Sequence, residues 1–170
     1  MLVPWVAAIL DRDLRTLRRE VEAYPDERGL WQAVPGISNV AGTLALHLAG
    51  NLQHYLGAHL AGTGYVRDRP AEFARRDVPR AELIRQIEAA RAAVKAALSG
   101  PELPDVAAVF PEKIGTSQVV VGDYLIHLAT HLAYHLGQID YHRRVVTGSR
   151  SAVDAVQPRE LSSARAGSQA

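Results

Sequence analysis

Seven histidines are the residues of this sequence whose type and spacing could do chemistry. They fall in two stretches of the chain, the first with His47, His54 and His59 and the second with His127, His131, His135 and His142. Imidazole is the commonest protein ligand for metals, so the two stretches indicate a metal centre if the fold brings them together. The sequence contains no cysteine, which excludes thiolate ligands and a cysteine nucleophile. Any thiol chemistry must therefore use a thiol from outside the chain.

The second stretch has the spacing of one face of an α-helix. His127, His131 and His135 fall within an arc of about 80° and rise by about 6 Å per step. Each adjacent pair can chelate one ion, whereas the outer pair, about 12 Å apart, cannot. The same face carries three more polar residues among leucines and an isoleucine: Tyr124, Gln138 and His142. A polar stripe of this kind needs partners in the folded protein.

The first stretch can supply at most one ligand to a site built on the second. His47 and His54 are nearly eclipsed, with Asn51 between them, but about 10 Å of helix rise separates them. His59 points about 120° away from His47, and we expect it to face solvent. The spacing favours three-histidine coordination, with one ligand from this stretch, an HxxxH pair from the second, and positions left open to water or substrate. Either adjacent pair of the second stretch fits this scheme.

Other polar residues near these positions are predicted to line the pocket or support the ligands rather than bind the ion: Asn51, His54, Asp123, Tyr124, His127 and Gln138. Asp123 precedes His127 by four residues, so it could orient an imidazole or act as an acidic residue at a helix N-terminus. His142 is near the end of its predicted helix, where we expect a partner of the helix dipole or a surface residue. The charges of residues 67–73 are interpreted as ties within a loop.

Apolar residues repeat every three or four positions in four stretches, which predicts four amphipathic helices. We place these helices at about 3–23, 38–61, 78–99 and from between 117 and 123 to 147–148, with Ser38 as N-cap of the second. The β-branched run 119–121 would also fit a short strand, but the pattern after it is helical, and we interpret it as the helix start. The sequence therefore predicts an all-α fold, a four-helix bundle with long connections.

Length and charge limit the remaining possibilities. The 170 residues suffice for one domain with its own core, and we predict a bundle domain over 1–148. Residues 149–170 form a polar tail that we expect to be flexible or to pack on a partner. A formal net charge of +1 argues against a nucleic-acid partner. No apolar run has the length of a signal peptide or membrane span, so we expect a cytoplasmic protein without membrane contact.

Three segments resemble the DinB-like family of metal-binding four-helix proteins: 47–52, 67–73 and, most specifically, His127-Leu-Ala-Thr-His-Leu-Ala-Tyr-His-Leu-Gly-Gln-Ile139. The likeness covers about residues 2–148. In that family one histidine of the second helix and the HxxxH directly before Gly-Gln bind the metal, which implies His47, His131 and His135 here. Many members read His-His-Arg-Gly-Gln at this point, where this chain has Tyr-His-Leu-Gly-Gln. The ligand position is kept, whereas no role of the extra histidine or of the arginine carries over.

The resemblance implies one divalent ion per chain, zinc or nickel, with iron and copper as alternatives that also suit imidazole ligands. Members with a known activity are metal-dependent transferases or isomerases that use low-molecular-weight thiols such as mycothiol or bacillithiol, and they commonly form homodimers. The first hypothesis is therefore a thiol transferase. The second is a metal-dependent hydrolase in which His54, His127 or Asp123 relays protons. The third is a non-catalytic, metal-stabilised binding or stress-associated module.

Overall fold

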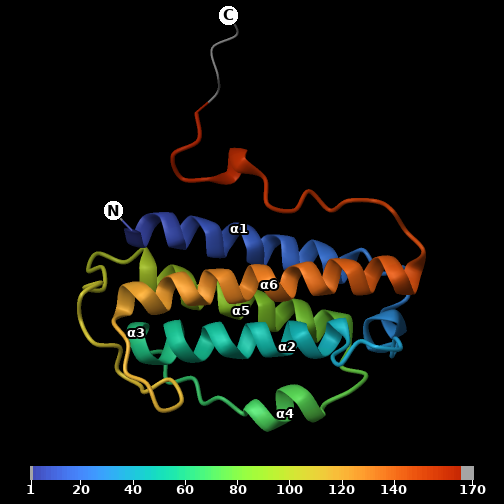
Figure 1. Ribbon diagram of the computed structural model, residues 1–170, viewed down its shortest axis with the longest axis horizontal. Helices are drawn as coiled ribbons and strands as arrows, with labels where there is room; N and C mark the ends of the chain where they lie inside the picture. Colours follow the sequence, from blue (N-terminus) through green and yellow to red (C-terminus); the bar gives the residue numbers. More distant parts are fainter. Residues whose placement is uncertain (1, 166–170) are drawn as a thin grey trace, which may run out of the picture.

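Four long helices packed side by side make up the body of the molecule (Figure 1). The computed structural model describes residues 2–165. The long helices are α1 (Leu2–Glu22), α2 (Ala41–Leu52), α5 (Arg80–Leu98) and α6 (Val121–Thr147). No strand forms within the described residues, which contain two isolated β-bridges. The prediction of an all-α, DinB-like four-helix bundle is thereby confirmed.

Short elements fill the connections between the long helices. Two 3₁₀ helices, η1 (Glu27–Trp31) and η3 (Pro158–Glu160), lie after α1 and in the C-terminal segment. The second connection contains the helix α4 (Arg69–Ala74), which packs beside α2 (Figure 1). Directly after α2 the chain continues through a π-helical segment, η2 (Gln53–Ala58), into the short α3 (His59–Ala61). The predicted helix 38–61 therefore corresponds to one continuous run over 41–61 with a π turn inside it.

The position of α2 explains its sequence. Every residue of α2 is buried, because α5, α6 and α4 pack against different sides of it. Its stretch of leucine, alanine and glycine meets this requirement, since a helix surrounded by others needs apolar residues all round. The two most polar side chains of α2, His47 and Asn51, are consequently inside the bundle and not on its surface.

The predicted helix boundaries differ from the observed ones mainly at the start of α2. Val40 is the N-cap residue of α2, without a side-chain hydrogen bond, and Ser38 precedes the helix. Helix α6 begins at Val121, as predicted, but the residues before it also pair in a bridge: Phe110 N–H donates to Val119 O at 2.9 Å. The β-branched run 119–121 therefore ends an extended segment and starts the helix.

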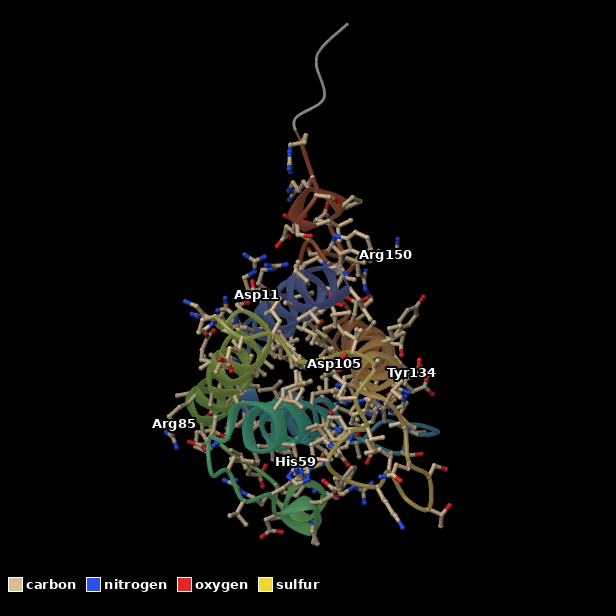
Figure 2. The ribbon with its side chains drawn as sticks, turned by 90° about the vertical axis from the view of Figure 1, so that its left-hand side faces the viewer. Asp11, His59, Arg85, Asp105, Tyr134 and Arg150 are labelled. Atoms are coloured by element: carbon tan, nitrogen blue, oxygen red, sulfur yellow. The ribbon has the colours of Figure 1, made fainter. Side chains whose placement is uncertain are left out.

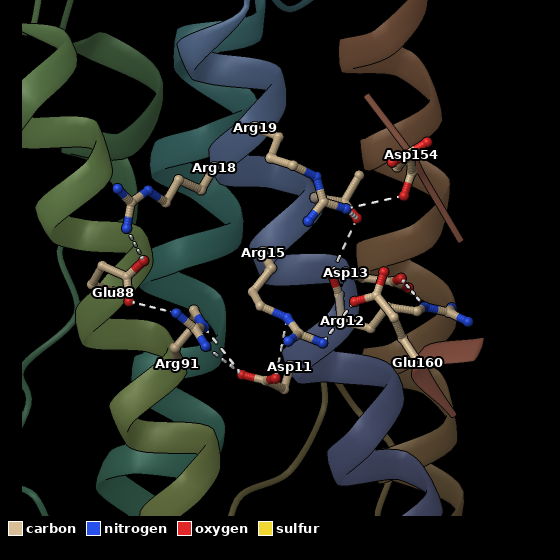
Figure 3. Close-up of polar contacts among 11 residues, drawn as sticks. Asp11, Arg12, Asp13, Arg15, Arg18, Arg19, Glu88, Arg91, Asp154 and Glu160 are labelled. Carbon is tan, nitrogen blue, oxygen red and sulfur yellow. Dashed lines mark hydrogen bonds and ion pairs between the residues drawn. The ribbon is translucent and has the colours of Figure 1, made fainter. Parts of the chain in front are cut away.

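Charged side chains join the helices both inside the bundle and on the outer face of α1. Arg143 of α6 and Glu20 of α1 are buried and form an ion pair with an N–O distance of 2.5 Å. On the outer face, Arg91 of α5 pairs with Asp11 at 2.9 Å, and Arg18 pairs with Glu88 at 3.2 Å (Figure 3). These contacts fix α1 between α5 and α6.

The C-terminal segment runs back along α1 as far as η3, after which the chain turns away from the bundle (Figure 1). Arg19 Nε donates to Val153 O at 2.8 Å, and Arg15 pairs with Glu160 at 2.7 Å. The division of the chain into a bundle over 1–148 and a separate tail stays a prediction. Within residues 2–165, no helix combines the length and apolar character that crossing a bilayer demands.

Candidate metal centre

Three histidines from two helices meet inside the bundle. His47 comes from the middle of α2, and His131 and His135 lie one turn apart on α6. One ring nitrogen of each lies within 4.8 Å of one ring nitrogen of the other two. The Nε2 atoms of His47 and His131 are 3.3 Å apart. This equals the separation of about 3.3 Å expected for two ligands of a tetrahedral ion with bonds of about 2.0 Å.

A carboxylate outside the cluster fixes the proton on His47. Glu72 Oε2, on α4, lies 3.1 Å from His47 Nδ1. Arg67 donates hydrogen bonds to both oxygens of Glu72, at 2.7 and 2.8 Å, and so keeps this carboxyl group ionised. An ionised carboxylate can only accept hydrogen bonds. Arg67 Nη2 also lies 3.3 Å from His47 Nδ1, but the ionised carboxylate is closer, so we assign the proton to His47 Nδ1, which donates it to Glu72. Its Nε2 is left with a free lone pair that faces His131, as a metal ligand requires.

The side-chain amide of Gln138 likewise accepts a hydrogen bond from Nδ1 of His135 and orients its ring. Gln138 Oε1 lies 2.7 Å from His135 Nδ1, at i+3 on the same helix. An amide oxygen accepts, so His135 Nδ1 donates and its Nε2 keeps the lone pair. Gln138 was predicted to line the pocket or support a ligand, and this contact gives it the second role.

Burial keeps two of the three imidazoles, those of His131 and His135, neutral. Burial, together with neighbouring His135 and His47, lowers the pKa of His131 to about 4. Burial likewise lowers the pKa of His135. Burial alone would raise the pKa of Glu72, but the hydrogen bonds from His47 and Arg67 outweigh it and hold that pKa below its usual value. At neutral pH His131 and His135 therefore offer neutral nitrogen donors, the form of imidazole that binds a divalent ion.

The close approach of Glu72 to His47 depends on a glycine. A Cβ atom at Gly50 of α2 would collide with Glu72 Oε1 and lie 2.9 Å from its Cδ. The missing side chain lets α4 place a carboxylate against α2, one turn from His47. Sequence reasoning interpreted the charges of residues 67–73 as ties within a loop. The Arg67–Glu72 pair is such a tie, but residues 69–74 form the helix α4, and the interpretation did not connect the tie to His47.

The remaining residues predicted to line the pocket differ in how far they are buried and in whether they contact the three histidines. His127 is exposed and stacks on His131 with ring centroids 5.9 Å apart, so it borders the cluster without joining it. Tyr124 is buried and stacks on the other side of His127 at 5.5 Å. Asn51 is buried, with its Oδ1 lacking a hydrogen-bond partner in the described structure. Asp123 is exposed in the first turn of α6 and bonds to no imidazole of residues 2–165.

The expectation for His142 was wrong. Its side chain is fully buried instead of lying at the surface. Its Nε2 donates to Gln32 O at 2.9 Å, which leaves Nδ1 to accept from the Tyr24 hydroxyl at 2.8 Å. Burial lowers the pKa of His142, so this neutral, fully bonded imidazole has a structural role.

The expectation for His59 was also wrong, and the cause is the π turn. His59 is half-buried and lies beside His54, with ring centroids 4.7 Å apart. Both imidazoles contact Glu112 of the 99–120 loop, with Nε2–Oε2 distances of 2.8 Å for His54 and 2.7 Å for His59. These three residues form the second histidine cluster of the molecule.

A surface groove of about 470 Å³ adjoins the three-histidine cluster. His135 and Gln138 form its inner side, and the exposed rings of Tyr134 and Tyr141 stand along it. Tyr134 points outward from α6 in the view down the bundle (Figure 2). The opposite side is the turn before α2, residues 36–39. The groove gives a small molecule access to the His135 side of the cluster.

Three residues around the clusters escaped the sequence reasoning: Gly50, Glu72 and Glu112. For Glu72 a signal exists, because Arg67 and Glu72 flank a short segment that the resemblance also covers. Gly50 lies beside Asn51 in another segment of that resemblance. Glu112 stands between a proline and a lysine in a loop, and no spacing connects it to a histidine.

The family model for mycothiol-S-transferases matches residues 5–148. This family is DinB-like, so the resemblance inferred from residues 47–52, 67–73 and 127–139 is confirmed over nearly the range predicted for it. No curated protein and no solved structure matches the chain.

Proposed function

We propose that this chain, which belongs to the mycothiol-S-transferase family, is a metal-dependent transferase that joins the thiol sulfur of mycothiol to an electrophile. The observation that carries the proposal is the convergence of three imidazoles in a chain without cysteine. Its donor set fits a divalent ion, because His47 and His135 each have Nδ1 engaged by an acceptor, which leaves Nε2 unprotonated.

The proposed reaction uses a thiol that the chain itself cannot supply. A sulfur–carbon bond forms. With chlorodinitrobenzene the carbon–chlorine bond breaks, chloride leaves and the thiol proton is released, whereas with an unsaturated electrophile such as maleylpyruvate the carbon–carbon π bond opens and takes up that proton. A free thiol with a pKa of about 8.5 is only a few per cent ionised at neutral pH. A divalent ion, when bound, supplies a Lewis acid that lowers the pKa of a thiol ligand.

The residues around the cluster divide the remaining tasks. His47, His131 and His135 would hold the ion, while Glu72 and Gln138 orient two of the three rings. The groove beside His135 would receive the body of the thiol substrate. His127 is exposed and stacked on His131, so its imidazole is placed to accept the released proton.

Three neutral nitrogen ligands give the bound ion its full double charge, which favours thiolate formation. Zinc and nickel suit such a site, and iron and copper are the alternatives. One ion at this cluster per chain and a homodimeric assembly remain part of the proposal.

The test is a thiol-dependence screen on the purified full chain. Protein loaded with zinc or nickel is incubated with chlorodinitrobenzene or maleylpyruvate and with mycothiol, bacillithiol, glutathione or cysteine. We expect turnover with mycothiol that disappears on chelation, returns with the metal and is lost in His131→Ala. Equal background rates for loaded, stripped and His131→Ala protein across all thiols would overturn the proposal. Metal-dependent ester or amide hydrolysis without thiol would favour the hydrolase hypothesis instead.

A further inference from the structure

We propose that His54, His59 and Glu112 form a second divalent-metal site, separate from the three-histidine cluster. The site takes a transition-metal ion such as zinc through two imidazole nitrogens and one carboxylate oxygen. Its ligand atoms already lie within 4.8 Å of one another. It stands on its own geometry and does not depend on the proposed transferase activity.

The π turn is what brings the two histidines together. In a regular α-helix, residues five positions apart differ by about 140° and face different directions. Here the His59 N–H bonds to His54 O, an i→i+5 hydrogen bond that closes one wider turn. Residues five apart then come close to eclipse, and the imidazoles of His54 and His59 face the same loop. π-Helical turns are rare and occur frequently at functional sites.

The third ligand comes from a loop that is firmly placed. Phe110, two residues before Glu112, is 1% exposed, and its ring packs against His59 and Tyr55 with centroids 5.9 and 6.1 Å away. The bridge between Val109 and Val120 holds the same segment. Glu112 is therefore brought to the histidines by buried contacts on its own side of the loop.

The two imidazole nitrogens and the carboxylate oxygen are a ligand set that zinc uses in other proteins. Two histidines and a glutamate form the protein ligand set of many catalytic zinc sites, with a fourth position left to water. Glu112 Oε2 lies 2.8 Å from His54 Nε2 and 2.7 Å from His59 Nε2. A tetrahedral ion needs about 3.3 Å between ligand atoms, so the cluster must open by roughly half an ångström. The Glu112 side chain is 38% exposed and has room for this movement.

Two ring nitrogens of the cluster have no hydrogen-bond partner in the described part of the chain. His54 Nδ1 and His59 Nε2 are buried without a hydrogen-bond partner among residues 2–165, although the second lies close to the carboxylate. Unsatisfied buried polar atoms cost free energy, and a ligand bond to an ion would satisfy the His59 nitrogen. An ion at this place would also tie the 99–120 loop to the end of the α2–η2–α3 run.

The second site lies apart from the first. His54 follows His47 by seven residues, which corresponds to about 10 Å of helix rise. Tyr55 of η2 packs beside His54 and against Tyr124 of α6, with ring centroids 4.8 and 5.0 Å away. No residue is shared between the two clusters, so each can be emptied without the other.

The experiment counts zinc ions on the full chain. Protein stripped by a chelator is titrated with Zn²⁺ by calorimetry, and bound metal is confirmed by elemental analysis after desalting. The wild-type chain should bind two equivalents. Glu112→Gln and His59→Gln should each bind one, and both change partly exposed residues that the core does not need. Glu102→Gln, the same substitution at an exposed position of the same loop, should bind two.

A second arm isolates the site from the first cluster. In the His131→Ala background one equivalent of Zn²⁺ should remain, and the imidazole NMR signals of His54 and His59 should shift as it binds. Adding Glu112→Gln to that background should remove the equivalent. The proposal is overturned if the wild-type chain binds a single equivalent that Glu112→Gln and His59→Gln leave unchanged. A metal that His131→Ala spares and Glu112→Gln removes upholds this site even if the first cluster binds none.

Discussion

The two histidine clusters share the helical run 41–61 but differ in how the backbone builds them. The first cluster uses regular α-helix, with His47 on α2 and an i, i+4 pair on α6. The second uses a π turn and a loop carboxylate. In the first, a carboxylate stands behind a histidine and orients it. In the second, the carboxylate is itself placed among the candidate ligands.

The difference shows two ways of giving imidazoles a defined orientation. In the three-histidine cluster, burial removes water and Glu72 and Gln138 fix the protons, so the rings are arranged before any ion arrives. In the second cluster one oxygen of a partly exposed carboxylate contacts both rings. The first arrangement is stiff and the second must open to admit an ion. We expect tighter metal binding at the first cluster.

The largest effect is expected from His131→Ala. This change removes one of the three proposed ligands of the first cluster, so zinc affinity there should fall by more than about 100-fold, beyond the loss typical of supporting residues. Mycothiol transfer should be lost with it. Calorimetric titration with Zn²⁺ and the thiol-transfer assay measure both. His59→Gln is the matched control from the other cluster, and equal losses in the two variants would contradict the separation of the clusters.

The next effect is expected from Glu72→Gln. The amide has nearly the same shape but no charge, so it orients His47 less strongly and leaves Arg67 without its ionic partner. Zinc affinity at the first cluster should fall by about 10- to 100-fold. Binding at the second cluster should stay the same. Glu102→Gln serves as control, and an unchanged first-site affinity in Glu72→Gln would show that the carboxylate does not support His47.

A smaller effect is expected from Gly50→Ala. The new methyl group would meet the Glu72 carboxylate, so Glu72 must move and its contact with His47 weakens. We expect a drop of about tenfold in first-site zinc affinity, the lower end of the range for supporting groups. Gly137→Ala is the control: it is helical with open space around its Cβ position, and alanine there should stabilise the helix by about 0.5–1 kcal/mol.

The smallest effect concerns His142, a histidine outside both clusters. Burial lowers its pKa in the folded protein, so below pH 6.5 the unfolded chain binds a proton that the folded chain does not. The stabilising contribution of His142 is thus present at pH 7 and is lost as the pH falls from 6.5 toward the folded-state pKa. Urea unfolding of metal-free protein at pH 7, 6 and 5 should show a steeper loss for the wild-type chain than for His142→Asn. Equal slopes would mean that His142 does not contribute.

Sequence periodicity was sufficient for the helices and for the histidines that regular helices carry. The apolar repeat predicts all four long helices, and the i, i+4 spacing puts His131 and His135 on one face. Either adjacent pair fitted this geometry, and the resemblance selected the one that the structure brings to His47. These features are local, because 3.6 residues per turn determine which side chains share a face whatever the surroundings.

The tertiary structure decided everything that depends on residues far apart in the chain. Glu72 reaches His47 only because α4 packs on α2 across the small Gly50. His142 is buried because Tyr24 and Gln32 surround it, and no spacing along its own helix reveals them. The π turn that joins His54 to His59, and the loop that carries Glu112, follow from packing and not from periodicity. Helix geometry depends on residues that are close in the sequence. The hydrogen-bond partners of a buried polar group depend on how the whole chain packs.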